Sequence, residues 1–170
     1  MRWTAIRAAL SRLALVAGLG LSACKAPPSV WDIITRLGEK APLRKATVQD
    51  VLPVAFELEA RTEHASRWAG GALDLADGAR VSAIHLLLDH DDRFDATSAL
   101  SLDMEGTCLT LADVRSRYPE LDLTDVPHGH SWEEQTLWTS TQAWGRVSFG
   151  FKAKNPDCLF SVTMRPPSHP

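Results

Sequence analysis

The sequence predicts an α+β domain, with a strongly twisted antiparallel sheet of six or seven strands and two short helices. Three observations support this fold class. Apolar and polar residues alternate with a period of two in several stretches after residue 54. Two segments, 30–37 and 110–117, have capping residues and helical spacing instead. An Asp-Gly pair separates two of the alternating stretches. Because strands outnumber helices, a small all-β barrel is the alternative.

The first predicted helix covers residues 30–37. Ser29 is suited to be its N-cap, and Asp32 three residues later gives an acidic variant of the capping box. Gly38 supplies a stop, and residues 38–45 are expected to form a loop. Pro53 argues against a helix over 47–51.

Seven strands are predicted near 56–61, 73–75, 80–89, 100–105, 137–141, 145–151 and 158–164. The pair Asp77-Gly78 favours a type I′ hairpin between the second and third. Thr110 is expected to cap the second helix, with Asp113 at its third position. The faces expected to be buried are Phe56, Leu58 and Ala60; Ile84, Leu86 and Leu88; Leu100, Leu102 and Met104; Val147, Phe149 and Phe151; and Cys158, Phe160, Val162 and Met164.

The N-terminus has the composition of an export signal. Residues 1–23 contain three arginines and no acidic residue, and an apolar run from Leu13 to Leu21 is too short to cross a bilayer. The run ends in Leu21-Ser22-Ala23-Cys24, which resembles the lipobox of bacterial lipoproteins. That resemblance implies cleavage before Cys24 and attachment of acyl chains such as palmitate to it. Ordinary secretion with cleavage nearby, or an uncleaved tail, is the alternative.

The expected organisation is a signal peptide over 1–23, a lipidated tether over 24–29, one globular domain over 30–165 and a mobile proline-rich tail over 166–170. Lys25 after the cysteine resembles lipoproteins sorted to the periplasmic face of the outer membrane, with the inner membrane or secretion as alternatives. Once Cys24 is assigned to lipid, two cysteines remain, Cys108 and Cys158. A pair of cysteines in a protein outside the cytoplasm indicates a disulfide. Two free thiols or a redox pair are the alternatives, although there is no C-x-x-C motif.

Charge limits the partner class. The whole chain has 18 Lys+Arg and 21 Asp+Glu. Without the three leader arginines the remainder is 15 against 21, a net charge of −6. Nucleic acid is therefore not an expected partner, because phosphate binding needs clustered basic residues.

Two polar clusters are candidate ligand sites. His128 and His130 flank a glycine and could share a metal ion, with Asp125 or Glu133 completing the ligand set. A loop capped by Ser131 is the simpler interpretation. The acidic stretch 89–95 lacks the spacing of a calcium-binding EF-hand, because Phe94 stands where glycine is needed; a solvated turn explains its charges.

No catalytic or cofactor motif is present, so we expect a non-enzymatic protein-binding module. In general design it resembles the immunity lipoproteins that neutralise toxins in the periplasm, a likeness of lipobox and size alone. The alternatives are a metal or small-ligand module at His128 and His130, or an envelope assembly scaffold. An outward tryptophan beside an arginine is typical of binding hot spots, and acidic groups would complement a basic partner. The candidate partner-binding residues are Trp132, Trp144, Arg146, Asp91, Asp92, Glu133 and Glu134.

Overall fold

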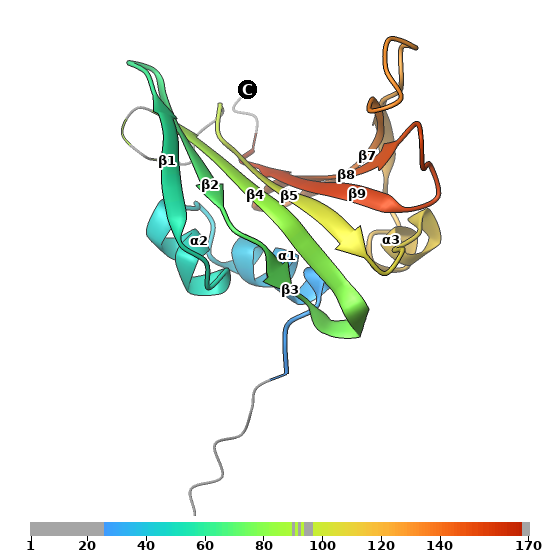
Figure 1. The fold of residues 1–170 in the computed structure, drawn as a ribbon, viewed down its shortest axis with the longest axis horizontal. Coiled ribbons are helices and arrows are strands. Elements are labelled where there is room, and N and C mark those ends of the chain that lie inside the picture. Colours follow the sequence, from blue (N-terminus) through green and yellow to red (C-terminus); the bar gives the residue numbers. More distant parts are fainter. Residues whose placement is uncertain (1–25, 90, 92, 94–96, 168–170) are drawn as a thin grey trace, which may run out of the picture.

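The computed structural model describes residues 26–89, 91, 93 and 97–167. In this part of the chain, nine strands form one antiparallel sheet accompanied by three short α-helices (Figure 1). The α+β class is therefore supported, but there are more strands and helices than predicted. The strands are β1 (Phe56–Arg61), β2 (Ala65–Gly70), β3 (Leu73–Asp74), β4 (Ala79–Asp89), β5 (Ala99–Gly106), β6 (Asp122–Asp125), β7 (Gln135–Gln142), β8 (Gly145–Lys152) and β9 (Leu159–Arg165).

The sheet has the strand order β1-β2-β4-β5-β9-β8-β7-β6, and β3 also pairs with β4. It consists of two antiparallel meanders, one from each half of the chain, which join where β9 pairs with β5. Because β1 and β6 end the order without pairing to each other, the sheet is not closed. The barrel alternative is therefore wrong.

Helices α1 (Val30–Glu39) and α3 (Leu111–Arg117) were predicted and are confirmed. Both begin with the expected capping box. In α1, the Ser29 hydroxyl accepts from the backbone N–H of Asp32 at 3.2 Å, and the Asp32 carboxylate accepts from that of Ser29 at 2.9 Å. The same reciprocal pair joins Thr110 and Asp113.

Helix α2 (Lys45–Val51) was not predicted. Residues 38–45 were expected to form a loop, but Lys45 begins this helix, and the expectation that residues 47–51 are not helical is wrong. The helix ends at Val51, so Pro53 follows its C-cap residue and clashes with no helical turn. Its N-cap, Arg44, makes no side-chain capping bond, which explains why no start signal was visible. In Figure 1, α1 and α2 lie together on one side of the sheet.

The core lies between this side of the sheet and the helices. The alternating residues predicted on β4, β5 and β8 are all buried there, together with Ile33, Ile34 and Leu37 of α1. Two aromatic residues complete the cover: Trp31 and Tyr118 both contact Phe149, with ring centroids 6.2 and 5.1 Å away. Burial of these apolar faces stabilises the sheet against the helices.

Two predicted faces need correction. In β1 only Phe56 is buried, and Leu58 is 46% exposed because the strand lies at the edge of the sheet. In β9 the alternation is broken by a bulge opposite Gly150 and Phe151. Leu159 consequently enters the core, whereas the Phe160 ring lies under the ammonium of Lys152 at 3.3 Å.

The Asp-Gly turn also differs from the prediction. A hairpin does join β3 to β4, but its turn is one 3₁₀ turn, η1 (Ala76–Gly78), rather than type I′. The N–H of Leu75 donates to the carbonyl of Ala79 at 2.9 Å, and Gly78 has a positive φ of 73°. A single left-handed residue thus suffices here, and glycine adopts it at no steric cost.

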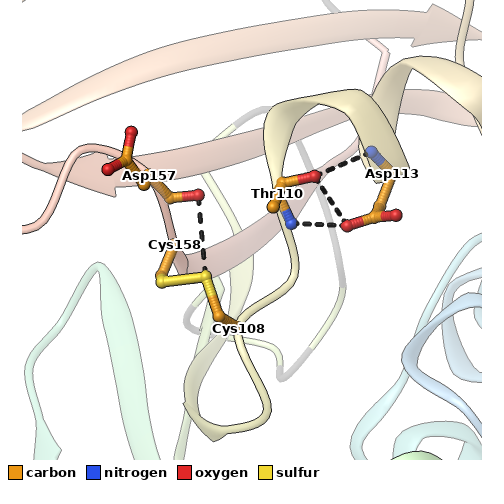
Figure 2. The surroundings of a disulfide bond; sticks show 5 residues. All are labelled: Cys108, Thr110, Asp113, Asp157 and Cys158. Atoms are coloured by element: carbon orange, nitrogen blue, oxygen red, sulfur yellow. Dashed lines mark hydrogen bonds between the residues drawn. A yellow bond between two sulfur atoms is a disulfide. The ribbon is translucent and has the colours of Figure 1, made fainter.

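The predicted disulfide between Cys108 and Cys158 is present (Figure 2). It joins the segment after β5 to the start of β9, 50 residues later in the chain. Beside it, the N–H of Leu159 donates to the carbonyl of Leu109 at 2.7 Å. The crosslink therefore connects the two halves of the chain next to the strand pair that joins their meanders.

The signal peptide, Cys24, Asp92 and residues 168–170 lie outside the described residues. At the other end of the chain, Pro166 is buried against Gly145. No helix in the described ranges combines the length and apolar character needed to span a membrane.

Candidate functional site

The most prominent surface feature is the connection between β6 and β7, residues 126–134, which we name the Trp132 loop. It projects beyond the sheet at the upper right of Figure 1. Four large apolar side chains of the described residues are exposed, and three lie in or beside this loop: Leu123 (52%), Val126 (46%) and Trp132 (76%). A hollow of about 360 Å³ adjoins the indole, lined by Pro127, Gly129, His130, Ser131 and Ala153.

A single carboxylate organises the first half of the Trp132 loop. Glu134 accepts hydrogen bonds from the backbone N–H groups of His128, Gly129 and His130, at 2.5 to 3.0 Å. Desolvation tends to raise the pKa of Glu134, but these three bonds outweigh it and hold the pKa below its usual value. The carboxylate is therefore charged at neutral pH and keeps the turn closed.

The second half of the loop is fastened to the end of β8. Glu133 pairs with Lys152 at 2.6 Å and with Lys154, and these hydrogen bonds lower the pKa of Glu133. The N–H of Lys154 donates to the carbonyl of Trp132 at 3.0 Å, and that of Ala153 to the carbonyl of Glu134 at 2.8 Å. The backbone of Trp132 is thus held in place while its indole points into solvent.

Hydroxyl groups reinforce the sheet on the side away from the helices. Their bonds connect neighbouring strands: Thr124 to Thr139 at 2.8 Å, Thr139 to Ser148 at 2.8 Å, and Ser101 to Thr163 at 2.7 Å. Gln135 of β7 also reaches across β8 to accept from Ser161 of β9 at 2.5 Å. This contact requires Gly150, since a Cβ there would lie 1.9 Å from the Gln135 Oε1. The strands that carry the Trp132 loop are therefore well supported.

The two candidate metal ligands, His128 and His130, lie in this loop. Their backbone N–H groups are bound by Glu134, and both residues are exposed. Among the described residues no three His, Cys, Asp or Glu side chains are grouped so that they could hold a metal ion. Metal binding at this turn stays a prediction that needs ligands from elsewhere.

The other tryptophan candidate has a different setting. Trp144 follows the opposite end of β7, and it is partly buried. Its indole lies against α1, where a Cβ on Gly38 would come within 2.3 Å of the ring nitrogen. Arg146 is exposed on β8, opposite Thr141 and Arg165 on the neighbouring strands. Of the two tryptophans, Trp132 offers the larger free surface.

The acidic candidates are divided between two places. Glu133 and Glu134 belong to the Trp132 loop, whereas Asp91 follows β4, which three strands separate from β7 in the sheet order. There Arg93 pairs with Asp91 at 2.9 Å, and the buried Asp89 accepts from the N–H of Arg93 at 2.6 Å. The fold thus brings the two histidines, Trp132, Glu133 and Glu134 into one loop, and leaves Asp91, Trp144 and Arg146 elsewhere.

Sequence reasoning missed Leu123 and Val126, because the four-residue strand β6 is too short and polar to show a period. Comparisons with protein-family models, curated proteins and solved structures found no match for this chain.

Proposed function

We propose that this protein is a lipid-anchored component of the bacterial cell envelope that acts by binding another protein through the Trp132 loop. The observation that carries the proposal is a 76% exposed tryptophan on a loop whose backbone is already fixed. Tryptophan is enriched among interface residues that dominate binding free energy. Because the loop is ordered beforehand, association loses less conformational entropy than it would with a flexible loop.

The proposal predicts that Trp132→Ala weakens capture of the partner at least tenfold, since truncating a central interface residue costs on the order of 2 kcal/mol. The measurement is a titration of immobilised full-length chain against envelope extract at low salt, with quantified retained protein. Leu58→Ala is the matched control, because it removes an exposed apolar side chain at the other edge of the sheet. Equal retention by Trp132→Ala and the unmodified chain would contradict the proposal, as would no saturable retention at all.

The anchor is the second part of the proposal. Its support is the lipobox Leu21-Ser22-Ala23-Cys24 and the short segment between Cys24 and the start of α1 at Val30. Intact-mass analysis of protein purified from membranes should give a chain that begins at Cys24 and carries acyl groups. Cys24→Ser should lack this mass and the membrane attachment. A native chain that begins at Met1 with a free thiol would refute the anchor.

Within this proposal, we favour an immunity or inhibitor protein, because the chain is small and acidic and carries the signal for a lipid anchor. Charge supports a basic partner, because opposite charge accelerates association. Protection of cells that co-express the captured partner would distinguish an immunity protein from an envelope assembly scaffold.

A further inference from the structure

We infer that the free edge of β6 accepts an extended, basic segment of the partner as an added strand. The inference rests on the proposed function and names the kind of segment that would bind beside the Trp132 loop.

The backbone of β6 is available for this. Within the described residues, β6 ends the strand order and pairs with β7 alone, and all four of its residues are exposed. An edge strand presents N–H and C=O groups on its unpaired side, and an extended peptide can bind them as a further strand. The occupant that satisfies this edge is therefore extended rather than helical.

Charge on one face of this edge indicates a basic occupant. Asp122 lies opposite Thr139, and Asp125 lies opposite Leu137 after a register shift between Leu123 and Asp125. Because of this shift, both residues are paired with β7 positions on the side away from the helices. Both are exposed, as is Glu120 before the strand, and none of the three makes an ion pair with a described residue. Lysine or arginine side chains of an added strand would lie beside these carboxylates.

The other face of the edge is apolar. Leu123 lies opposite Trp138, on the side of the helices, and Arg115 covers the Trp138 ring at 4.9 Å from its centroid. The nearby cation is thus on the opposite face from Asp122 and Asp125. Val126 and Trp132 extend the exposed apolar surface into the loop. An added strand that alternates basic and apolar residues would match both faces.

A second copy of this chain is a poor occupant. The other free edge, β1, carries the exposed Glu57 and Glu59, so pairing of β6 with β1 or with another β6 would bring carboxylates together. The β1 edge is itself a weaker candidate for a basic strand. It contains Arg61, lies beside Arg67, and offers only Leu58 as a large exposed apolar side chain.

The test uses the full-length chain in mild detergent and a fluorescent probe, a peptide of about eight residues that alternates lysine and valine. Fluorescence anisotropy should show saturable binding that weakens as salt rises. A glutamate–valine peptide should not bind. Two further peptides carry N-methyl groups on the amides of either the odd or the even positions. One of the two should bind at least tenfold more weakly, because its methyl groups replace the N–H groups that would pair with β6. Asp122→Lys combined with Asp125→Lys should also lower the affinity at least tenfold, whereas Glu57→Lys combined with Glu59→Lys should change it less than twofold.

The inference is overturned if both pairs of lysine substitutions weaken binding equally, if neither N-methylated peptide loses affinity, or if the native chain forms dimers through β6. Loss of peptide binding with Trp132-dependent capture intact would refute the added strand and leave the proposed function standing. Loss of that capture while the peptide still binds β6 would refute the Trp132 interface and leave the strand inference standing.

Discussion

Removal of the Cys108–Cys158 bond is expected to lower the free energy of unfolding by about 4 kcal/mol. The two cysteines are 50 residues apart, so the crosslink lowers the conformational entropy of the unfolded chain by closing a long loop. In the native state it also fastens the start of β9 to the segment after β5, where the two halves of the sheet meet. The destabilisation should therefore appear as a lower midpoint for the whole domain rather than local fraying.

Urea unfolding followed by tryptophan fluorescence measures this effect in Cys108→Ser, Cys158→Ser and the double serine variant. The three variants should agree with one another and with the parent chain under reducing conditions, because each condition removes the same bond. A midpoint equal to that of the oxidised parent would show that the crosslink does not constrain the unfolded chain.

Gly145→Ala is expected to destabilise the fold by about 3 kcal/mol or to prevent folding. Gly145 has φ 142°, a region that L residues rarely adopt, and an added Cβ would lie 2.1 Å from the carbonyl oxygen of Arg165. The obstacle is backbone of the neighbouring strand β9, which cannot rotate away as a side chain could. The β8–β9 pair would have to separate at this end.

Substitutions at two other glycines separate the effect of backbone strain from that of the steric clash. Gly129 has φ 86° but nothing within 4 Å of an added Cβ, so Gly129→Ala should cost only about 1 kcal/mol of backbone strain. Gly71 has neither a positive φ nor a close neighbour, so Gly71→Ala should be close to neutral. Thermal unfolding of the three variants gives the ranking, and a Gly145→Ala variant as stable as Gly71→Ala would refute the steric argument.

The elements predicted correctly are those whose signals are local. The capping boxes at Ser29 and Thr110 involve residues three positions apart, and the alternation in β4, β5 and β8 matches strands that have neighbours on both sides. The two errors about buried faces concern position in the sheet. Leu58 alternates as a core residue should, but its strand lies at the edge, and the β9 bulge moves Phe160 out of register. Neither fact can be read from a short segment.

The candidate site shows the same division. A sequence reveals that Trp132 and Trp144 are both near a hairpin, but only the fold distinguishes the exposed indole from the one packed against Gly38. Glu134 was predicted as an acidic partner-binding residue, and its role within the loop was not visible in the sequence. Its carboxylate accepts from three backbone N–H groups of the preceding turn, four to six residues earlier, and this depends on a loop conformation that the sequence spacing does not specify.

The place of β9 in the middle of the sheet has a consequence for how the sheet assembles during folding. Of the described strands, β9 comes latest in the chain, and it joins the two meanders, since β5 and β8 both pair with β9 and not with each other. Until β9 is in place the two meanders cannot form one sheet, and the β5–β9 pairing that joins them brings together residues about 60 positions apart in the chain, which slows folding. Removing β9 would therefore divide the sheet in two and leave the edges of β5 and β8 unpaired, with only the helices packed against both parts.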